Sequence, residues 1–385
     1  MGLFSKQQSY LGIDFDKDSV KVVELKNEDG RPRLVTYGYL DQEIERRKLG
    51  DEAGGRNEHL AITKLITQVC HQAKTTTNKA ITALPAYSVF TSILNLPTLS
   101  KKDLASAVKW EAKKVIPLPI EDMILDWKII SEDVPVTPRE DTEQETETEE
   151  EVEEEKITAR RFLKIKPSKA AKQYTKILLT AAPKDLVKQV IEIFKAAGMN
   201  LLSLDTESFA LIRSLVGNDR AGLMIVDIGS IVTNISVVAN GIPILNRSLD
   251  IGGLTITKAI ANSLNISLAR AEQFKFDIGI SPDQHGQGNI PKTIEGSIQP
   301  IIDELKYSLN LYKSQGQKPI EKIILTGGSS LLLNLPEYLA GLLDLKVYRG
   351  DPWARVIYPE ELKPVLDEIG ARFSVAVGLA MRDIE

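Results

Sequence analysis

Two aspartates that lie 213 residues apart stand in similar sequence surroundings. Asp14 follows an apolar segment at 10–13 and Asp227 follows another at 223–226, and each precedes a turn and a second apolar segment. This pattern predicts a β-hairpin at both places. Backbone N–H groups of two such turns could hold phosphate oxygens from opposite sides, and the two carboxylates, with Glu207, could bind Mg²⁺ or its water ligands. A single aspartate at a strand end is usually only a turn residue, but the repetition predicts two similar lobes that face a cleft.

Pairs of glycines offer a second kind of ligand contact. Gly327, Gly328 and Ser329 follow an apolar strand expected at 323–326, and we expect a helix after them. Glycine lets the backbone approach a ligand closely and a helix N-terminus presents free N–H groups, so a purine could lie here. An ordinary tight turn uses two glycines as well. A second pair, Gly252 and Gly253, precedes a helix expected at 254–264.

Glu272 and Lys275 lie one turn apart in a further helix, which Ser267 is expected to cap. Both could reach a ribose, and an ordinary surface ion pair explains them equally well. The chain has no G-x-x-x-x-G-K-[ST] motif, which argues against a nucleotide site of the P-loop kind. The two hairpin turns are therefore the phosphate-binding elements that the sequence offers.

Alternating strand and helix patterns place these residues in an α/β chain. Short apolar or alternating runs predict strands at 20–25, 33–39, 79–84, 174–181, 201–204, 231–238 and 242–249. Helices are expected at 59–72, after Ser100 and at 183–197, because apolar residues recur there at helical spacing.

The composition excludes several classes of protein. The 385 residues suffice for two domains, and no apolar stretch reaches the roughly 18 residues of a membrane span. The net charge of −5 includes eleven acids between Glu140 and Glu155, which predict a disordered loop and leave the rest of the chain at +6. That mild positive charge, without interleaved aromatic and basic residues, argues against nucleic-acid binding. A single cysteine, Cys70, and three scattered histidines argue against disulfides and zinc, and we expect an untargeted, cytoplasmic chain.

Taken in order, the motifs resemble the actin-like ATPase clan, and within it the PilM family of type IV pilus assembly proteins. Gly2-Leu3-Phe4, then Leu11-Gly12-Ile13-Asp14 and Ser19-Val20-Lys21, are similar to the family's start and first phosphate loop. Motifs at 83–85, 96–97, 111–112, 116–119 and 125–127 resemble its inserted subdomain, a helix packed on a small sheet. Motifs at 181–184, 197–199, 205–211, 227–233, 251–253, 271–275, 326–329 and 375–380 complete the series. The resemblance covers nearly the whole chain apart from the acidic run.

This resemblance implies an α/β actin-like fold whose two duplicated lobes enclose a site for ATP and Mg²⁺. It places along one side of the triphosphate Gly12, Asp14, Ser19, Val20 and Lys21, and along the other Asp227, Gly229, Ser230 and Thr233. It also implies that Gly252 and Gly253 bind the nucleotide. It places Glu272 and Lys275 at the ribose, and it places at the adenosine Gly327, Gly328 and Ser329. The acids expected to bind the metal or its waters are Asp14, Asp227 and Glu207.

The family pattern also bears on catalysis. Glu207 stands where hydrolysing members of the clan keep an acid that positions water. Asp16 stands where many members have glycine, which adds negative charge near the expected phosphates, and Ile231 replaces a small or hydroxyl residue. We therefore expect ATP to be bound tightly and to be hydrolysed slowly, if at all.

The family pattern implies three parts and a membrane partner. The first lobe is expected at 1–84 and 182–220, the inserted subdomain at 85–181 with a disordered acidic loop at 134–159, and the second lobe at 221–385. The implied role is a cytoplasmic pilus platform component that binds the cytoplasmic N-terminal tail of a PilN-like membrane protein, alongside other platform proteins. Membrane association would be indirect, through the partner, and a homo-oligomer stays open. Candidate partner contacts are Leu96, Trp110, Ile116 and Leu118, although buried packing explains each of them as well.

Two alternatives belong to the same clan. The first is a sugar or metabolite kinase, but nothing in the sequence marks a sugar pocket. The second is a filament-forming tether like FtsA, a family that usually ends in an amphipathic membrane helix. Here the segment 381–385 is polar, which favours the pilus component over the tether.

Overall fold

The structure is a computed structural model that describes residues 8–16, 19–41, 58–135, 173–280, 289–314, 316 and 318–384. The acidic run at 140–155 and the motif Gly2-Leu3-Phe4 lie outside these residues. The chain forms two compact units, of which the smaller comprises Ile93–Pro117 and Asp126–Leu179. Within the described ranges, no helix combines the length and apolar character needed to cross a bilayer.

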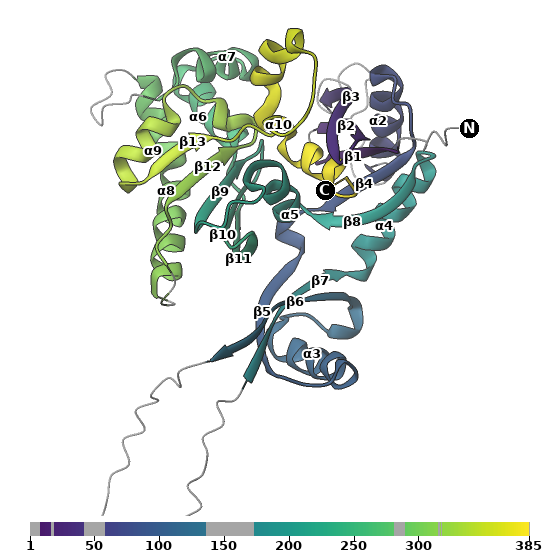
Figure 1. The fold of residues 1–385 in the computed structure, drawn as a ribbon. Helices are drawn as coiled ribbons and strands as arrows, with labels where there is room; N and C mark the ends of the chain where they lie inside the picture. Colours follow the sequence, from purple (N-terminus) through teal and green to yellow (C-terminus); the bar gives the residue numbers. More distant parts are fainter. Residues whose placement is uncertain are drawn as a thin grey trace, which may run out of the picture. The chain divides into compact units, whose positions relative to one another are not determined.

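The first five-stranded sheet of the larger unit has the order β3-β2-β1-β4-β8 (Figure 1). Its strands are β1 (Ser9–Phe15), β2 (Ser19–Glu28), β3 (Arg31–Asp41), β4 (Lys79–Leu84) and β8 (Asn200–Thr206). Strands β1 to β3 form an antiparallel meander, and β4 lies parallel to both β1 and β8. Helices α2 (Glu58–Ala73) and α4 (Lys184–Ala196) pack on each other and on this sheet, because both present an apolar face to it.

The second five-stranded sheet repeats the first. Its order is β11-β10-β9-β12-β13, with strands β9 (Leu223–Ile228), β10 (Thr233–Ala239), β11 (Ile242–Leu249), β12 (Lys322–Thr326) and β13 (Lys346–Arg349). The pairings β9–β10 and β10–β11 are antiparallel, and β12 is parallel to β9 and β13. The two sheets thus share strand order and strand direction, which confirms the predicted duplication.

The strand register shows that individual residues of the two sheets are equivalent. Asp14 in β1 lies opposite Lys21 in β2, and Asp227 in β9 lies opposite Asn234 in β10. In both hairpins the partner comes seven residues later in the chain. Asp14 and Asp227 therefore occupy the same position in the two sheets, as their sequence surroundings predicted.

Helices of the second lobe cover its sheet, and their apolar residues form one core cluster with β9, β10 and β12. They are α6 (Gly253–Leu264), α7 (Leu268–Ile278), α8 (Asn289–Ser314) and α9 (Leu335–Leu343). Ser267 caps α7 as predicted, since its Oγ accepts a hydrogen bond from the Arg270 N–H. The helix expected directly after Gly327 and Gly328 is instead a short 3₁₀ turn, η4 (Gly328–Leu331), and α9 begins only at Leu335.

Helix α10 (Lys363–Met381) joins the two sheets into one core. It packs on β1, β2, β12 and α5 (Glu207–Leu211), and a single apolar cluster contains Tyr10 of β1, Ile225 of β9 and Phe373 of α10. The close packing depends on glycine: a Cβ at Gly12 would lie 1.9 Å from the Ala376 carbonyl oxygen, and one at Gly378 would lie 1.9 Å from the Ala210 carbonyl oxygen. The remaining short turns of this unit are η1 (Ala86–Ser88), η2 (Ile120–Asp122), a π-helical turn η3 (Ile212–Val216) and η5 (Glu360–Leu362).

A three-stranded sheet of order β5-β7-β6 carries helix α3 (Lys101–Val115). The strands are β5 (Phe90–Pro97), β6 (Met123–Pro135) and β7 (Gln173–Pro183). Ser100 caps α3 by accepting the Asp103 N–H, and Leu104, Val108 and Ala112, which recur at helical spacing along it, are buried. Strand β6 includes residues 134 and 135, so the start of the predicted loop at 134–159 is wrong by two residues.

Candidate functional site

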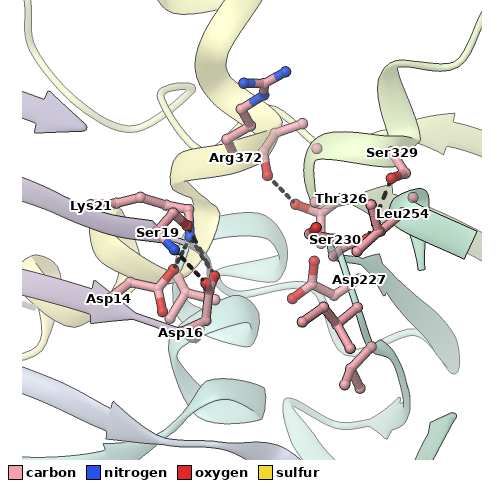
Figure 2. Close-up of a pocket in the computed structure, with 18 of the residues that line it drawn as sticks. Asp14, Asp16, Ser19, Lys21, Asp227, Ser230, Leu254, Thr326, Ser329 and Arg372 are labelled. Atoms are coloured by element: carbon pink, nitrogen blue, oxygen red, sulfur yellow. Dashed lines mark hydrogen bonds and ion pairs between the residues drawn. The ribbon is translucent and has the colours of Figure 1, made fainter. Parts of the chain in front are cut away.

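A cavity of about 570 Å³ in the larger unit brings the two hairpin turns together. It is lined by residues of both lobes, of α7 and of α10. Figure 2 shows the residues of the two turns and Arg372 of α10. Thirteen of the residues predicted from the sequence line it: Asp14, Ser19, Lys21, Glu207, Asp227, Gly229, Ser230, Gly253, Glu272, Lys275, Gly327, Gly328 and Ser329.

The first hairpin turn holds a compact cluster of charges. The Lys21 ammonium lies 3.1 Å from an Asp14 carboxylate oxygen and 3.0 Å from one of Asp16. The Ser19 N–H and hydroxyl both donate to the Asp16 carboxylate, at 2.7 and 3.0 Å. Burial raises the pKa of Asp14 although Lys21 lowers it, and the two carboxylates raise the pKa of Lys21 despite its burial.

The second turn lies across the cavity, and the Asp227 carboxylate points into the space between the two turns (Figure 2). Burial is the main cause that raises the Asp227 pKa to about 7, and the Asp14 charge adds to it. The turn rests on the start of α6, because the Gly253 and Leu254 N–H groups donate to the carbonyls of Gly229 and Ser230 at 2.9 and 2.8 Å. These N–H groups are therefore used within the protein and do not face a ligand.

Gly327 contacts the second turn so closely that no side chain fits. Its φ is 82°, a left-handed conformation that favours glycine, and a Cβ there would lie 2.4 Å from Asp227 Oδ1. Ser329, two residues on, donates its hydroxyl to the Gly229 carbonyl at 3.3 Å. The diglycine segment and the second phosphate turn thus form one continuous wall of the cavity.

Glu207 lies at the first residue of α5, which Thr206 caps. Its Oε2 accepts hydrogen bonds from the Ala86 N–H at 2.9 Å and from Asn234 Nδ2 at 3.1 Å. Burial first, and then the charge of Asp14, raise the Glu207 pKa to about 8. Glu207, which lines the cavity, thereby joins the first lobe to β10 of the second lobe.

Lys275 is the centre of a buried polar cluster at the α7 side of the cavity. Only 2% of the residue is exposed, and its ammonium lies 2.8 Å from Glu272 Oε2 and 3.0 Å from Thr257 Oγ1. The Thr257 hydroxyl also donates to Glu272. Burial lowers the pKa of Lys275 even though Glu272 opposes the shift. Lys275 is thus buried although the Glu272 side chain is 47% exposed, and this burial distinguishes the pair from the ordinary surface pair that is the alternative explanation.

Four residues predicted to bind nucleotide have other places in the structure. Gly12 faces helix α10, as its 1.9 Å approach to Ala376 requires, and Val20 is fully buried in the core. Thr233 is fully buried and donates its hydroxyl to the Ile251 carbonyl. Gly252 packs against the Ser230 carbonyl, 2.5 Å from where its Cβ would be. None of these four lines the cavity.

Several polar residues line the cavity without having been predicted, among them Tyr39, Asn234 and Arg372. Tyr39 and Asn234 come from strands next to the two turns, and Arg372 comes from α10, far along the sequence. The duplication could have indicated Asn234, because Asn234 pairs with Asp227 as Lys21 pairs with Asp14. Arg372 has no local signal, because only the packing of α10 brings it to the cavity.

The described residues contain no group of three or more His, Cys, Asp or Glu side chains that could hold a metal ion by themselves. Asp14, Asp227 and Glu207 nevertheless line the same cavity. Mg²⁺ commonly keeps several waters and takes its remaining ligands from one or two carboxylates and a phosphate. The three acids fit that kind of binding rather than an all-protein cage.

The four candidate partner contacts differ in exposure. Leu96 and Ile116 are buried, as packing residues are. Trp110 and Leu118 are 62% and 53% exposed. The Lys114 ammonium lies 3.4 Å from the centre of the Trp110 ring, which places a cation on the exposed face of α3.

Comparison with solved structures identifies proteins with a similar fold. A chain in the solved structure of a "PilM-PilN type IV pilus biogenesis complex" is 25% identical, with a TM-score of 0.72 over 98% of both chains. The ethanolamine utilization protein EutJ from Carboxydothermus hydrogenoformans, 13% identical, has a TM-score of 0.52 over 97% of this chain and 89% of its own. A MamK double helical filament, also 13% identical, has a TM-score of 0.51 over 98% and 99% of the two chains. The fold is the α/β actin-like fold, with two duplicated lobes.

Sequence comparison identifies relatives and a family. The cell division protein FtsA of Neisseria meningitidis serogroup B is 26% identical over 53% of this chain and 53% of its own length, and FtsA of Rhizobium meliloti is 28% identical over 41% and 39%. The chain thus spans about half the length, or less, of the curated relatives it matches. The family described as "Type IV pilus assembly protein PilM" matches residues 12–160 and 155–384. Because this match covers nearly the whole chain and agrees with the fold, the chain belongs to the PilM family of type IV pilus assembly proteins.

Proposed function

We propose that this protein is a cytoplasmic, ATP-binding component of the type IV pilus inner-membrane platform that binds the N-terminal tail of a PilN-like membrane protein. The observation that carries the nucleotide part is the pair of equivalent hairpin turns that face each other across one cavity. The partner part is supported by family membership and by the similar solved structure, in which PilM forms a complex with PilN. The proposed partners also include other platform proteins and a second copy of this chain.

The cavity has room for a nucleotide, and a lysine of each lobe, Lys21 and Lys275, lines it. Its volume, about 570 Å³, falls within the roughly 300–1,000 Å³ usual for small-molecule sites. Gly327 and Gly328 line the cavity without side chains that would fill it, and the Lys275 cluster lies at the α7 end, where a ribose would be expected. Asp14 and Asp227 line the same cavity from the two opposite turns (Figure 2), and their side chains would face the phosphates.

The charge of the lining explains why a divalent cation belongs to this proposal. The cavity is lined by seven acids and only three bases, Lys21, Lys275 and Arg372. A triphosphate entering alone would meet net repulsion, because like charges a few ångströms apart disfavour each other by kilocalories per mole. When bound, Mg²⁺ would neutralise phosphate charge, and Asp14, Asp227 and Glu207 would hold its waters.

The state of Glu207 supports slow turnover. A general base must be deprotonated and lie near the water it activates. With a pKa of about 8, Glu207 is largely protonated at neutral pH in the ligand-free protein, and its Oε2 already accepts from Ala86 and Asn234. The acid that would position water is thus held as a structural link between the lobes, which favours binding over fast hydrolysis.

Nucleotide retention by the purified protein tests the proposal. Asp227→Ala should retain at least about tenfold less nucleotide than wild type, since a hydrogen bond to a charged group contributes about 1.5–3 kcal/mol. Nucleotide that stays bound through gel filtration would be released by denaturation and measured by mass spectrometry. Asp303→Ala, an exposed acid on α8 outside the cavity, is the control and should retain nucleotide like wild type. Full retention by Asp227→Ala would show that the two turns are not the phosphate site.

A membrane tether like FtsA is a second candidate because of the FtsA relatives. The last described helix, α10, does not fit the role of a membrane anchor. Its apolar residues, among them Leu366, Phe373 and Leu379, are buried inside the larger unit. Sedimentation with anionic vesicles, without any partner protein, separates the two. Binding to bare vesicles would favour the tether, whereas recruitment only by vesicles that carry the tail of a PilN-like protein would favour the platform component.

A further inference from the structure

Asp16 takes up the donors of the first turn that would otherwise face a phosphate. Its Oδ1 accepts the Ser19 N–H at 2.7 Å, and its Oδ2 accepts the Ser19 hydroxyl and the Lys21 ammonium, each at 3.0 Å. These are a backbone N–H, a hydroxyl and a cation, the three kinds of donor that bind phosphate oxygens in proteins. The carboxylate of Asp16 therefore sits in the turn as an internal anion.

The charge of this turn is also negative overall. Lys21 is shared between Asp14 and Asp16, so two carboxylates oppose one ammonium, and the formal charges of Lys17 and Asp18, which follow Asp16 in the sequence, cancel each other. The second turn has no such acid after its strand: Asp227 is followed by Gly229 and Ser230, which line the cavity with small groups. The two equivalent turns thus differ at the position of Asp16, and only the first carries its own anion.

The first turn is where the end of a polyphosphate chain would arrive. The parts proposed to hold adenosine lie against the second turn, since Ser329 Oγ and the Gly253 N–H both bond the Gly229 carbonyl, at 3.3 and 2.9 Å. A nucleotide anchored there extends its phosphates across the cavity toward the opposite lobe. Its terminal phosphate would then approach Ser19, whose N–H and hydroxyl already donate to Asp16, and Lys21, which Asp16 shares with Asp14.

We propose that Asp16 is a specificity-determining residue that makes this site discriminate between nucleoside diphosphate and triphosphate by occupying the anion position of the first turn. A diphosphate leaves that position to Asp16. A triphosphate must either displace the Asp16 carboxylate or bind together with a cation that screens its terminal phosphate from this carboxylate. Displacement is feasible because 49% of the Asp16 side chain is exposed, so it can turn toward solvent. This inference rests on the proposed nucleotide binding and adds a preference between two ligands.

Calorimetric affinities for ADP and ATP, with Mg²⁺ present, test the inference. Asp16→Asn keeps the size of the side chain and removes its charge, and Asp16→Gly removes both. Each should tighten ATP binding relative to ADP by at least roughly fivefold, the value for two unit charges about 4 Å apart even with the screening of bulk water. The matched control is Asp250→Asn, an exposed acid of the same lining, which should change both affinities by a similar factor.

Each outcome has a defined meaning. An ATP-to-ADP affinity ratio unchanged in both Asp16 variants, or changed equally by Asp250→Asn, would overturn the role of Asp16 while leaving nucleotide binding intact. A wild-type protein that binds neither nucleotide would overturn the proposed function itself. If the Asp16 variants fail to fold, the affinities of the wild-type protein for ADP and ATP in EDTA test the inference. The wild type should then bind ADP more tightly than ATP, and equal or tighter binding of ATP would refute the inference.

Discussion

Replacing Gly12 by alanine tests whether this residue serves helix packing or ligand binding. The new methyl group would lie 1.9 Å from the Ala376 carbonyl oxygen and 2.6 Å from the Ala380 nitrogen. Both are backbone atoms of α10, so no rotation of a side chain can relieve the contact. Since ordinary carbon contacts begin near 3.4 Å, β1 and α10 would have to separate by roughly 1.5 Å.

Such a separation opens the core that joins the two sheets. Overpacking usually costs about 1–3 kcal/mol, and a clash with rigid backbone on both sides belongs at or above the upper end of that range. With a melting shift of about 2–4 °C per kcal/mol in domains of 150–250 residues, we expect the midpoint to fall by at least about 5 °C. The measurement is thermal unfolding of nucleotide-free protein followed by circular dichroism.

The control is Gly341→Ala in α9, where no atom lies within 4 Å of the new Cβ. That change should leave the midpoint unchanged or raise it slightly, because alanine is favoured over glycine in a helix by about 0.5–1 kcal/mol. If Gly12→Ala melted within 1 °C of wild type, using ~1 °C as the resolution of such scans, the β1–α10 contact would be refuted. If it lost only nucleotide affinity, Gly12 would be a ligand residue, as the family pattern implied.

Two further predictions concern pH and the partner. Stability of the ligand-free protein should fall as pH rises from about 4 to about 8, because the folded state keeps protons on Asp227 and Glu207 up to pKa values of about 7 and 8 while the unfolded state has lost them. In urea unfolding at several pH values, Asp227→Asn and Glu207→Gln should each make this decline shallower, and an unchanged pH dependence would contradict the assigned protonation. Trp110→Ala should change stability by less than about 0.5 kcal/mol, because the side chain is 62% exposed, and should weaken binding of a synthetic PilN-like N-terminal tail. Normal tail affinity would remove Trp110 from the partner surface.

Local sequence patterns determined the elements and the duplication. Strands β4 and β11 coincide with their predicted ranges, and α3 and α7 begin at the predicted serine caps. Hairpin signals are local, since the strands adjoin in the chain and their apolar periodicity fixes which face is buried. For the same reason Asp14 and Asp227 could be identified as equivalent before their place in one cavity was known.

Only the tertiary structure decided what these residues face. Gly12 and Thr233 lie in the predicted strands, yet one packs on α10 and the other bonds the Ile251 carbonyl. Arg372 reaches the cavity only because α10 returns to β1. The short spacing from Asp16 to Lys21 is visible in the sequence, but the hydrogen bonds of the Asp16 carboxylate with Ser19 and Lys21 are set by side-chain geometry. Periodicity along the chain specifies elements, whereas the direction in which a polar group points depends on packing between elements that are distant in the chain.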